Sequence, residues 1–592
     1  MTGEALKQKK AIINKLVNSG INTSPLVLEA LLNLKNPNED LKIIIKEASF
    51  IPSFKGHLTW DILREISNEK VKKQLKKYLQ YSVSKDITED LTEETIQEEF
   101  GEEIGDLIQE DSENLSLELA VEESVSPLAT HLEDDLDIFS LDQKKEIGKP
   151  VKIVSSVSGK SAFAFKPIAK NYDTSFEILR DPTGKLHTNG DYNDFYELTL
   201  DKYSKLEELM RKRPEVQTAL QINKINQRYE NNDVSIMGLV LETRRTKNGN
   251  YFLRIEDLTG IMNVLVKDDP RNQDIFKIAE STIRDQMLYI QGTFSPGQND
   301  SKGIIFADYL TKIDIPTNFQ AKRSPDPISM ALISDMHIGS KEFEEAIFSR
   351  FIDFLNGKIG NKTVREIAGK VKYLIINGDL VDGIGVYPNQ QSDLNISDIY
   401  EQYGKAAEFL SRIPSYIKIF YTAGNHEPVR NAIPRPRVPK KYCEDLVNLG
   451  IVCLGNPAYI KTHEVTTLIY HGEGIHDLNM LLPNFNIEKP TDAMREFLKC
   501  RHLAPIYGEK TQIAPTSNDW LVIDKIPDIF HTGHIHINGC DYYRNVALIN
   551  SGCFQAQTDF MRSFGIQPTP GIVPIIELDT LKPHPIDLKN HH

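Results

Sequence analysis

The first 80 residues alternate apolar and polar positions with a helical period. Apolar residues recur three or four positions apart over residues 10–20, 24–34 and 58–66, which is the spacing that gives a helix one apolar face. Ser24 followed by Pro25 fits an N-cap with proline at the first helical position. Nothing in the segment has the residue types that catalysis requires. The pattern therefore predicts a small N-terminal helical domain, residues 1–80, that docks onto a partner.

From residue 81 to residue 155 the apolar pattern gives way to acidic residues. Residues 86–143 contain 21 Asp or Glu and no Lys or Arg, and such a stretch buries too little apolar surface to offset the entropy of ordering. We predict an acidic disordered linker over residues 81–155. Its charge explains the net charge of −15, because the rest of the chain carries +6. A mildly basic body is compatible with a polyanionic partner but does not establish one.

A change of period marks the middle of the chain. Residues 156–232 mix helical and extended patterns and are expected to form a preface to the strands that follow. Residues 233–317 contain five short strand-like runs, with a helical stretch near residues 274–283 before the fourth run. This order is the one expected of an OB-fold β-barrel. Asn248 followed by Gly249, between the first two runs, predicts a type I′ hairpin turn.

The first predicted hairpin carries basic and aromatic side chains together. Arg244 and Arg245 precede its turn, and Tyr251 and Phe252 follow it. OB barrels bind single-stranded nucleic acid with this combination of groups. The alternative is that the rings fill the barrel core while the basic groups are merely solvated. Arg244 and Arg245 are therefore candidate DNA-binding residues.

Beyond residue 326, apolar strand-like runs repeatedly end in side chains that bind metal ions. These side chains are Asp335, His337, Asp379, Asp382, Asn425, His426, His471, His534 and His536. The steps between positions 335, 379, 425 and 471 are 44, 46 and 46 residues, which suits a strand, a crossover helix and the next strand. We therefore expect the strands to end at one rim of a sheet. The spacing of Asp335 and His337 predicts that both side chains lie on the same side of an extended segment.

These residue types suit a pair of divalent cations. Two cations about 3.5–4 Å apart need a carboxylate that bridges them, and Asp379 is the natural candidate. Imidazoles and an amide oxygen supply further ligands without so much negative charge that a phosphodiester is repelled. The mixed set favours Mn²⁺, with Fe²⁺ and Zn²⁺ as alternatives, over Mg²⁺, which prefers oxygen ligands and water.

These residues lie in five short segments that resemble the motifs of the calcineurin-like metallophosphoesterase superfamily, D-x-H, G-D-x-x-D, G-N-H-[DE], H and G-H-x-H. The resemblance implies an α/β/β/α domain over residues 326–582 with two metal ions. One metal would be held by Asp335, His337, Asp379 and His536, and the other by Asp379, Asn425, His471 and His534. By the same resemblance, His426 is not a ligand but orients the scissile phosphate and protonates or stabilises the leaving oxygen. Asp382 would hydrogen-bond to a metal ligand or to His426 and hold it in position. The alternative is an ordinary Asp in a turn.

A barrel directly before such a domain is the plan of the B-subunits of replicative DNA polymerases. Within that group the chain is similar to the small subunits of archaeal family D DNA polymerases, most clearly in LKCRHLAPIYGEKTQIAP, LVIDKIPDIFHTGHIHINGC and LINSGCFQAQTDFMRSFGIQPTPGIVPIIEL. The resemblance implies a multidomain α+β protein with 3′→5′ exonuclease activity that removes misincorporated nucleotides, working with a large polymerase subunit. One departure is Glu427, where many relatives have Asp, and we expect the longer carboxylate to be tolerated outside the metal shell.

Further basic side chains are candidates for contact with a single-stranded or mispaired 3′ end of DNA. Arg430 and the basic run 435–441 follow the third motif and are suited to hold phosphates, with a solvated loop as the alternative. Arg501, His502 and Tyr507 are further candidates. A sliding clamp is a further candidate partner.

Composition limits where in the cell the protein is expected. No run approaches 18 uncharged apolar residues, and the N-terminal residues have no apolar stretch of the kind found in export signals. The five cysteines form no CxxC pair, which indicates reduced thiols and argues against a zinc ribbon. We therefore expect a cytoplasmic protein that makes no membrane contact. Two rival functions stay open, a catalytically weak scaffold or assembly subunit of the polymerase and a phosphatase of the same superfamily.

Overall fold

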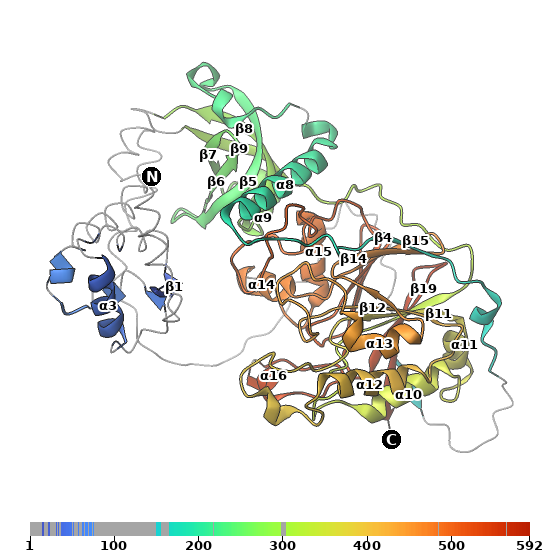
Figure 1. Ribbon diagram of the computed structural model, residues 1–592. Coiled ribbons are helices and arrows are strands. Elements are labelled where there is room, and N and C mark those ends of the chain that lie inside the picture. Colours follow the sequence, from blue (N-terminus) through green and yellow to red (C-terminus); the bar gives the residue numbers. More distant parts are fainter. Residues whose placement is uncertain are drawn as a thin grey trace, which may run out of the picture. The chain divides into compact units, whose positions relative to one another are not determined.

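The computed structural model describes residues 150–154, 165–216, 218–297, 303–482, 485–563 and 565–591, together with short pieces of residues 15–75. The chain divides into two compact units, Met1–Glu122 with Gly297–Ser301, and Glu123–Pro296 with Lys302–His592. The second unit contains a closed β-barrel and a domain built on two sheets (Figure 1). Residues 81–149 of the predicted linker lie outside the described residues.

Helix α3 (Pro37–Ala48) is the longest described element of the first unit. It has Glu39 and Asp40 in its first turn and Lys46 in its last turn, charges that suit the helix dipole. Two very short strands, β1 (Asn22–Thr23) and β2 (His57–Leu58), pair in parallel, and the apolar pattern did not predict them. Within the three predicted helical segments, residues 15–16, 31 and 62–63 are helical, and most of the other residues lie outside the described ones.

Five strands of the second unit close into a barrel in the order β5-β6-β7-β9-β8. They are β5 (Asp233–Arg245), β6 (Tyr251–Asp257), β7 (Gly260–Val266), β8 (Met287–Ser295) and β9 (Ile304–Lys312), and α9 (Gln273–Glu280) lies between β7 and β8 in the chain. The long strand β5 closes the barrel because its first half pairs with β8 and its second half with β6. Alternate residues such as Val240, Leu253 and Ile290 fill the interior. The five strands and the late helix agree with the sequence pattern.

The hairpin between β5 and β6 differs from the prediction. A type I′ turn needs a positive φ at both central residues, but of Asn248 and Gly249 only the glycine has one, at 84°. Instead the Gly249 amide donates to the Thr246 carbonyl at 2.9 Å, and the Thr246 amide donates to Asn250 at 2.7 Å. These bonds fit the three-residue hairpin loop, in which an ordinary turn is followed by a left-handed glycine.

Two sheets form the core of the larger domain. The seven-stranded sheet has the order β13-β12-β11-β10-β19-β20-β3, in which β19 spans Ile572–Glu577. The six-stranded sheet has the order β17-β18-β16-β15-β14-β4. Strands β10 (Ser329–Ile333), β11 (Val371–Asn377), β12 (Lys418–Thr422) and β13 (Val452–Leu454) run parallel in the first sheet. Strands β15 (Val465–Ile469), β16 (Ile529–Thr532) and β18 (Val546–Asn550) run parallel in the second, flanked by antiparallel β14 (Ala458–Thr462) and β17 (Gly539–Tyr543).

Alternation of apolar side chains along these strands builds four layers. Ile333 and Ile376 face helices α10 (Glu345–Leu355), α11 (Lys362–Lys370), α12 (Ile399–Leu410) and α13 (Lys440–Asn448). Their neighbours Leu332 and Ile375 face the second sheet. The far side of that sheet, at Phe530, packs against α14 (Gly474–Leu481) and α15 (Pro490–Cys500). The order is α/β/β/α, as the resemblance implied (Figure 1).

The predicted domain boundaries need correction, because segments from outside residues 326–582 complete the two sheets. Strand β3 (Val151–Val154), at the end of the predicted linker, pairs with β20 (Pro583–His591), which itself lies beyond the predicted end of the domain. Strand β4 (Phe176–Arg180), in the predicted preface, pairs with β14. Helix α8 (Tyr192–Arg211) confirms the helical part of the preface and packs against the barrel through Tyr203 and Leu206. Such edge strands were not predicted because their local sequence does not indicate which distant strand they pair with.

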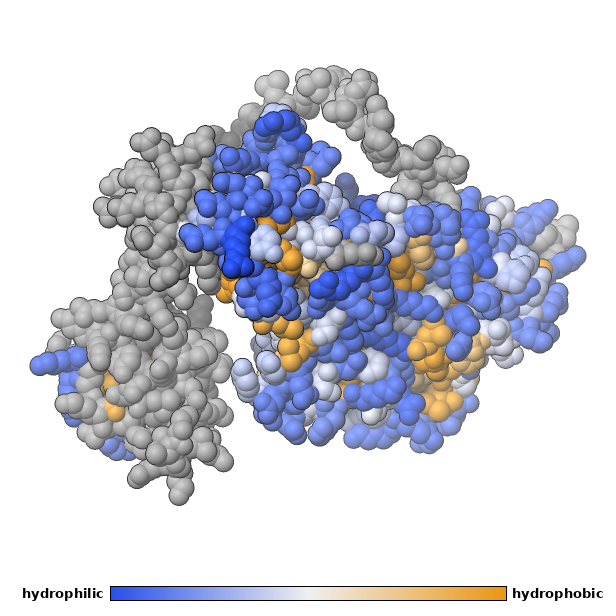
Figure 2. All heavy atoms as spheres, turned by 90° about the horizontal axis from the view of Figure 1, so that it is seen from above, coloured by the Kyte–Doolittle hydropathy of each residue, from blue (hydrophilic) through white to orange (hydrophobic). Residues whose placement is uncertain are grey.

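The described surface is largely polar. The face seen in Figure 2 is mainly hydrophilic and is interrupted by smaller apolar patches. No described helix has both the length and the apolar character that crossing a membrane requires.

Candidate metal centre

The side chains with metal-binding chemistry gather where strands of both sheets end. Asp335, Asp379 and Asn425 follow β10, β11 and β12 of the seven-stranded sheet, whereas His471 and His534 follow β15 and β16 of the six-stranded sheet. The expectation of one rim of one sheet is therefore wrong. The even spacing along the chain hides a switch of sheet between Asn425 and His471, which the chain makes through α13, β13 and β14.

The backbone at the centre is held in an uncommon conformation. Five of the residues with metal-binding side chains have a positive φ: Asp335 (55°), His337 (53°), Asp379 (51°), His534 (69°) and His536 (61°). A positive φ is uncommon outside glycine, although Asn, Asp and His adopt it more readily than other residues. The segment Asp335–His337 is consequently not extended, so the predicted reason for its spacing was wrong. Backbone strain of this kind tends to cluster at functional sites.

Glycines allow the connecting loops to approach one another closely. A Cβ atom on Gly378 (φ 82°) would lie 2.4 Å from Nδ1 of His471, and one on Gly424 would lie 2.3 Å from Oδ1 of Asp379. Both positions therefore require glycine because a side chain would collide with members of the centre.

Three overlapping groups of side chains have their potential ligand atoms within 4.8 Å of one another: Asp335, His337 and His536; His337, Asp379 and His426; and Asp379, His471 and His534. Nε2 of His337 lies 3.1 Å from Nε2 of His536. Nε2 of His471 lies 3.2 Å from an oxygen of Asp379 and 3.1 Å from Oδ1 of Asn425. Asp379 belongs to two of the groups and lies between them.

Surrounding acceptors orient the imidazoles. Nδ1 of His471 lies 2.8 Å from the carbonyl of Asn377, and Nδ1 of His337 lies 3.0 Å from Oδ1 of Asp382. Each Nδ1 thus carries the proton, which leaves the Nε2 lone pair for the centre. Oδ1 of the buried Asp335 has no hydrogen-bond partner among the described residues, as is expected of an oxygen that faces a cation site.

The electrostatics favour the forms that bind a cation. Burial by itself would raise the pKa of Asp379, but the imidazoles of His471 and His426 outweigh it and hold that pKa well below its usual range. Burial, helped by the charge of His471, lowers the pKa of His534 well below its ordinary value.

His471 and His536 are exceptions. Asp379 and Asp335 overcome the effect of burial and raise the pKa of His471 to about 9. Cys553 and Asp335 likewise overcome burial and raise the pKa of His536 well above its ordinary value. A cation bound here would displace the proton of His471.

His426 lies beside the groups and is only partly buried. Its Nδ1 lies 2.7 Å from the carbonyl of Asp382, and its amide donates to Oδ1 of Asp379 at 2.9 Å. Its ring meets that of His337 edge-on at 4.5 Å, and the exposed ring of Tyr387 lies 6.5 Å away. The second ring nitrogen is therefore free of the contacts that fix the first. Tyr387 was not foreseen, because a lone tyrosine in a loop carries no sequence signal.

Glu427 connects the loops that carry the centre, a role that the sequence did not suggest. One carboxylate oxygen accepts hydrogen bonds from the amides of Asp379 (3.0 Å) and Gly424 (2.6 Å). The other accepts from the amide of Leu380 (2.8 Å) and the hydroxyl of Tyr421 (2.7 Å). Burial and the charge of Asp379 raise the pKa of Glu427 to about 7. As expected, Glu427 lies outside the three groups of potential ligands.

The candidate DNA-binding residues have different surroundings. Arg501 is buried and donates to the carbonyls of residues 523 and 524, and His502 is buried with Nε2 3.0 Å from Asp519. These internal bonds occupy both side chains and do not support the predicted contact with DNA. Arg430 is half-buried and donates to Pro434 and Leu186 carbonyls. Local sequence does not distinguish a buried arginine from an exposed one.

The basic groups of the barrel hairpin pack on its rings. The guanidinium of Arg244 lies 4.9 Å from the Phe252 ring, and that of Arg245 lies 6.0 Å from the Tyr251 ring. Tyr251 in turn packs on Phe276 at 5.0 Å and lines the barrel core. Arg244 keeps 43% of its side chain exposed, so its guanidinium stays accessible to solvent while it packs on the ring.

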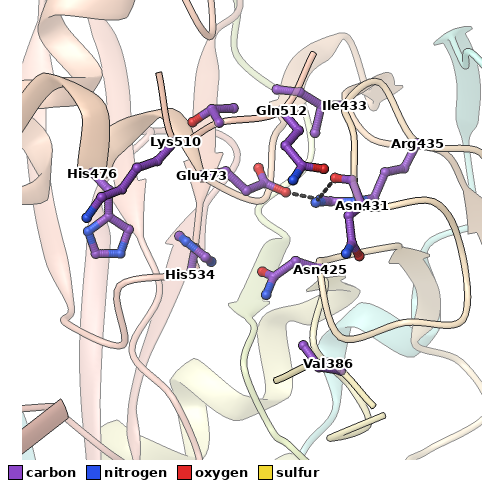
Figure 3. Close-up of a pocket in the computed structure, with 11 residues that line it drawn as sticks. Val386, Asn425, Asn431, Ile433, Arg435, Glu473, His476, Lys510, Gln512 and His534 are labelled. Atoms are coloured by element: carbon purple, nitrogen blue, oxygen red, sulfur yellow. Dashed lines mark hydrogen bonds and ion pairs between the residues drawn. The ribbon is translucent and has the colours of Figure 1, made fainter. Parts of the chain in front are cut away.

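A pocket of about 240 Å³ opens beside the centre. Asn425 and His534 line it together with residues from the loops around 431–435 and 510–512 and from α14. Figure 3 shows Glu473, Gln512 and Asn425 around this pocket, with Lys510 and His476 on one side.

Comparisons with known proteins agree with this architecture. Residues 328–538 match the family model of calcineurin-like phosphoesterases. The chain is 39% identical to the DNA polymerase II small subunit of Methanothermobacter thermautotrophicus, over 70% of this chain and 83% of that one. It is 38% identical to the protein of the same name from Pyrococcus furiosus, over 71% of this chain and 69% of that one. For the protein from Methanocaldococcus jannaschii the identity is 37%, over 74% and 72%.

Proposed function

This chain belongs to the family of archaeal DNA polymerase II small subunits, and from that premise we propose that it is the proofreading subunit of a replicative polymerase. It would act as a two-metal 3′→5′ exonuclease that hydrolyses DNA phosphodiester bonds, and it would work with a large catalytic subunit. The observation that carries the proposal is the set of three overlapping groups of potential ligands, which His337 and Asp379 link because each belongs to two of them.

The donor set fits two divalent cations. Asp335, with a buried oxygen that accepts no hydrogen bond from the described residues, supports one site together with His337, Asp379 and His536. Asn425, His471 and His534 support the other, with Asp379 shared. The mixture of imidazole, carboxylate and amide favours Mn²⁺. When bound, the cations would polarise the phosphate and lower the pKa of an attacking water.

His426 is the residue proposed to handle the leaving group. Its Nδ1–H points to the Asp382 carbonyl, so the ring is held with Nε2 available to the substrate. Hydrolysis joins the water oxygen to phosphorus, breaks the bond between phosphorus and O3′, and requires a proton on O3′. His426 would supply that proton. Asp382, which also holds His337, would position both rings.

The remaining parts are proposed to bind the polymerase and DNA. We assign the barrel to the OB-fold because its first strand pairs with both the second and the fourth, and its fifth closes onto the third. The hairpin arginines Arg244 and Arg245 and the loop residue Arg430 are proposed to hold DNA phosphates, whose recognition is independent of sequence. The N-terminal residues 1–80 are proposed as a docking domain, and residues 81–149 as an acidic tether. Contact with a sliding clamp is a further proposal.

The direct test is degradation of a 5′-labelled oligonucleotide with a mispaired 3′ end in the presence of Mn²⁺. We expect stepwise shortening from the 3′ end. His426→Ala should slow it by about 10²–10⁴-fold, the usual contribution of a general acid, and Asp379→Asn should abolish it. The matched control is His187→Ala, which changes an exposed imidazole. Wild-type rates in His426→Ala would contradict the mechanism.

The two rival functions predict different results. A scaffold subunit predicts no nuclease in the wild type and normal binding of the large subunit by Asp379→Asn. A phosphatase predicts faster turnover of a phosphopeptide or a cyclic nucleotide than of the oligonucleotide.

A further inference from the structure

The pocket beside the centre has rigid walls. Two loops that are far apart in the chain form them, and these loops are joined by backbone hydrogen bonds. The amide of Ile433 donates to the Gln512 carbonyl at 2.9 Å, and the amide of Ala514 donates to the Ile433 carbonyl at 2.8 Å. A pocket whose walls are joined in this way is formed before any ligand enters.

A buried ion pair forms the back of the pocket. Arg435, 2% exposed, pairs with the carboxylate of Glu473 and directs another nitrogen to the Asn431 carbonyl at 2.6 Å. Because the guanidinium neutralises Glu473, that carboxylate does not repel a phosphate nearby. The backbone of Arg435 pairs with Asn456, whose side chain accepts the amide of His471 at 3.2 Å. The wall and the metal centre are therefore one connected structure.

The side chains that the pocket presents to a ligand are of mixed chemistry. Asn431 and Gln512 are exposed and offer amide donors and acceptors, Lys510 offers an ammonium group, and Ile433 offers an apolar surface (Figure 3). Amide side chains hydrogen-bond the edges of nucleobases, and the ammonium suits a phosphate. The volume of about 240 Å³ suits a single nucleotide unit.

We infer that this pocket receives the 3′-terminal nucleotide of the DNA strand and holds it as the nucleoside 5′-monophosphate that hydrolysis releases. The inference rests on the proposed function. Asn425 and His534 line the pocket and His426 does not. Since His426 is proposed to protonate O3′ of the strand that remains, the other side of the phosphate belongs to the departing nucleotide. The phosphate stays on that nucleotide because the bond that breaks is the one between phosphorus and O3′.

A pocket for one nucleotide has a consequence for the mode of cleavage. The pocket volume of about 240 Å³ accommodates one nucleotide, which a free 3′ end supplies, whereas an internal bond continues into further chain. The pocket therefore favours an exonuclease that releases single nucleotides over an endonuclease. Asn431 and Gln512 are the residues that we assign to holding the departing nucleotide.

Thymidine 5′-monophosphate is the probe for a binding test by calorimetry on the full chain. We expect the wild type to bind it, and Gln512→Ala and Asn431→Ala each to weaken binding by about fivefold, the usual effect of one lost hydrogen bond. The KM for the 3′-mispaired oligonucleotide should rise by the same factor. Hydrolysis of bis(p-nitrophenyl) phosphate, which has no nucleotide, should be unchanged. Gln273→Ala, an exposed glutamine on α9, is the matched control and should match the wild type.

The outcomes separate this inference from the proposed function. If the wild type does not bind thymidine 5′-monophosphate, or if both pocket variants bind it as the wild type does, the pocket is not a nucleotide site, whether or not DNA is degraded. If the wild type releases nothing from DNA, the proposed function fails. The binding of thymidine 5′-monophosphate then still shows whether the pocket is a nucleotide site. A parallel loss of bis(p-nitrophenyl) phosphate hydrolysis in the variants would also overturn the inference, because the variants would then have damaged the metal centre.

Discussion

Replacement of Glu427 by glutamine tests how the loops of the metal centre are held together. The side chain keeps its shape, but one oxygen becomes an NH₂ group. If that group faced the amides of Asp379 and Gly424, two buried donors would lose their acceptor. If it faced the other way, the Tyr421 hydroxyl could turn and accept, and only the amide of Leu380 would be orphaned. The second arrangement costs less, because an orphaned buried donor costs about 1–3 kcal/mol.

The expected cost in Glu427→Gln is therefore about 1–3 kcal/mol of unfolding free energy. For a domain of this size it should lower the melting temperature by about 2–4 °C per kcal/mol. Because the same bonds hold Asp379 in place, kcat for the oligonucleotide should fall by about tenfold, the equivalent of about 1.4 kcal/mol. Thermal unfolding and single-turnover kinetics measure the two effects.

The matched control for this experiment is Glu444→Gln. Glu444 is exposed and pairs with Lys440 on α13 at 3.4 Å, and such a pair contributes at most about 1 kcal/mol. The control should melt and turn over as the wild type does. A Glu427→Gln protein with unchanged melting temperature and kcat would refute the bridging role, and an equal loss in both variants would show that the effect is unspecific.

Three further changes test other parts of the structure. Asp382→Asn removes the carboxylate that holds a ligand imidazole at 3.0 Å, so calorimetry should show Mn²⁺ affinity reduced by about 10–100-fold, and unchanged affinity would contradict that role. Lys312→Met removes the ammonium that lies 2.5 Å from the buried Glu496 carboxylate and leaves it with Lys499, 3.5 Å away. The expected cost in urea unfolding is therefore below that of a fully broken buried pair, about 3–5 kcal/mol. The double variant with Glu496→Leu should recover most of this cost, and no recovery would rule out an ion-pair effect. Burial by itself would raise the pKa of Asp519, but His502 outweighs it and lowers that pKa from 3.8 to about 2. The stability from this shift, about 2 kcal/mol, is present above about pH 4 and is lost as the pH falls toward 2. Asp519→Asn should therefore lose less stability over this range than the wild type. An identical dependence of stability on acid in both proteins would exclude the coupling.

Local structure was predictable where the spacing of apolar residues or a single residue type determines it. The strands and late helix of the barrel followed from alternation and turn residues, and their order in the chain agrees with the structure. The turn at Asn248 and Gly249 shows the limit, since asparagine tolerates either sign of φ and only the loop as a whole selects one. The extended arrangement expected for Asp335 and His337 failed for a similar reason, because contacts with the neighbouring loop at Gly378 and Asp379 impose a positive φ on both.

Burial and long-range partners were not predictable. Arg501 has the same residue type as an exposed phosphate ligand, yet its donors meet carbonyls of residues 523 and 524. Glu427 was expected only to be tolerated, and two of its four donors come from residues 379 and 380, which lie 48 and 47 positions away in the sequence. Such roles depend on which groups the folded chain brings together, and no local window contains that information.

The order of residue types along the chain already contained the chemistry of this protein, because carboxylates, imidazoles and one amide follow successive apolar runs, and apolar runs of that length form strands. Tertiary structure alone decided that these strands divide between two sheets, that His337 and His536 meet across 199 positions of sequence, and that Asn425 and His534 line one pocket. The reason is physical: period and propensity act over a few residues, whereas strand pairing and burial depend on contacts between segments whose separation in sequence leaves no local trace.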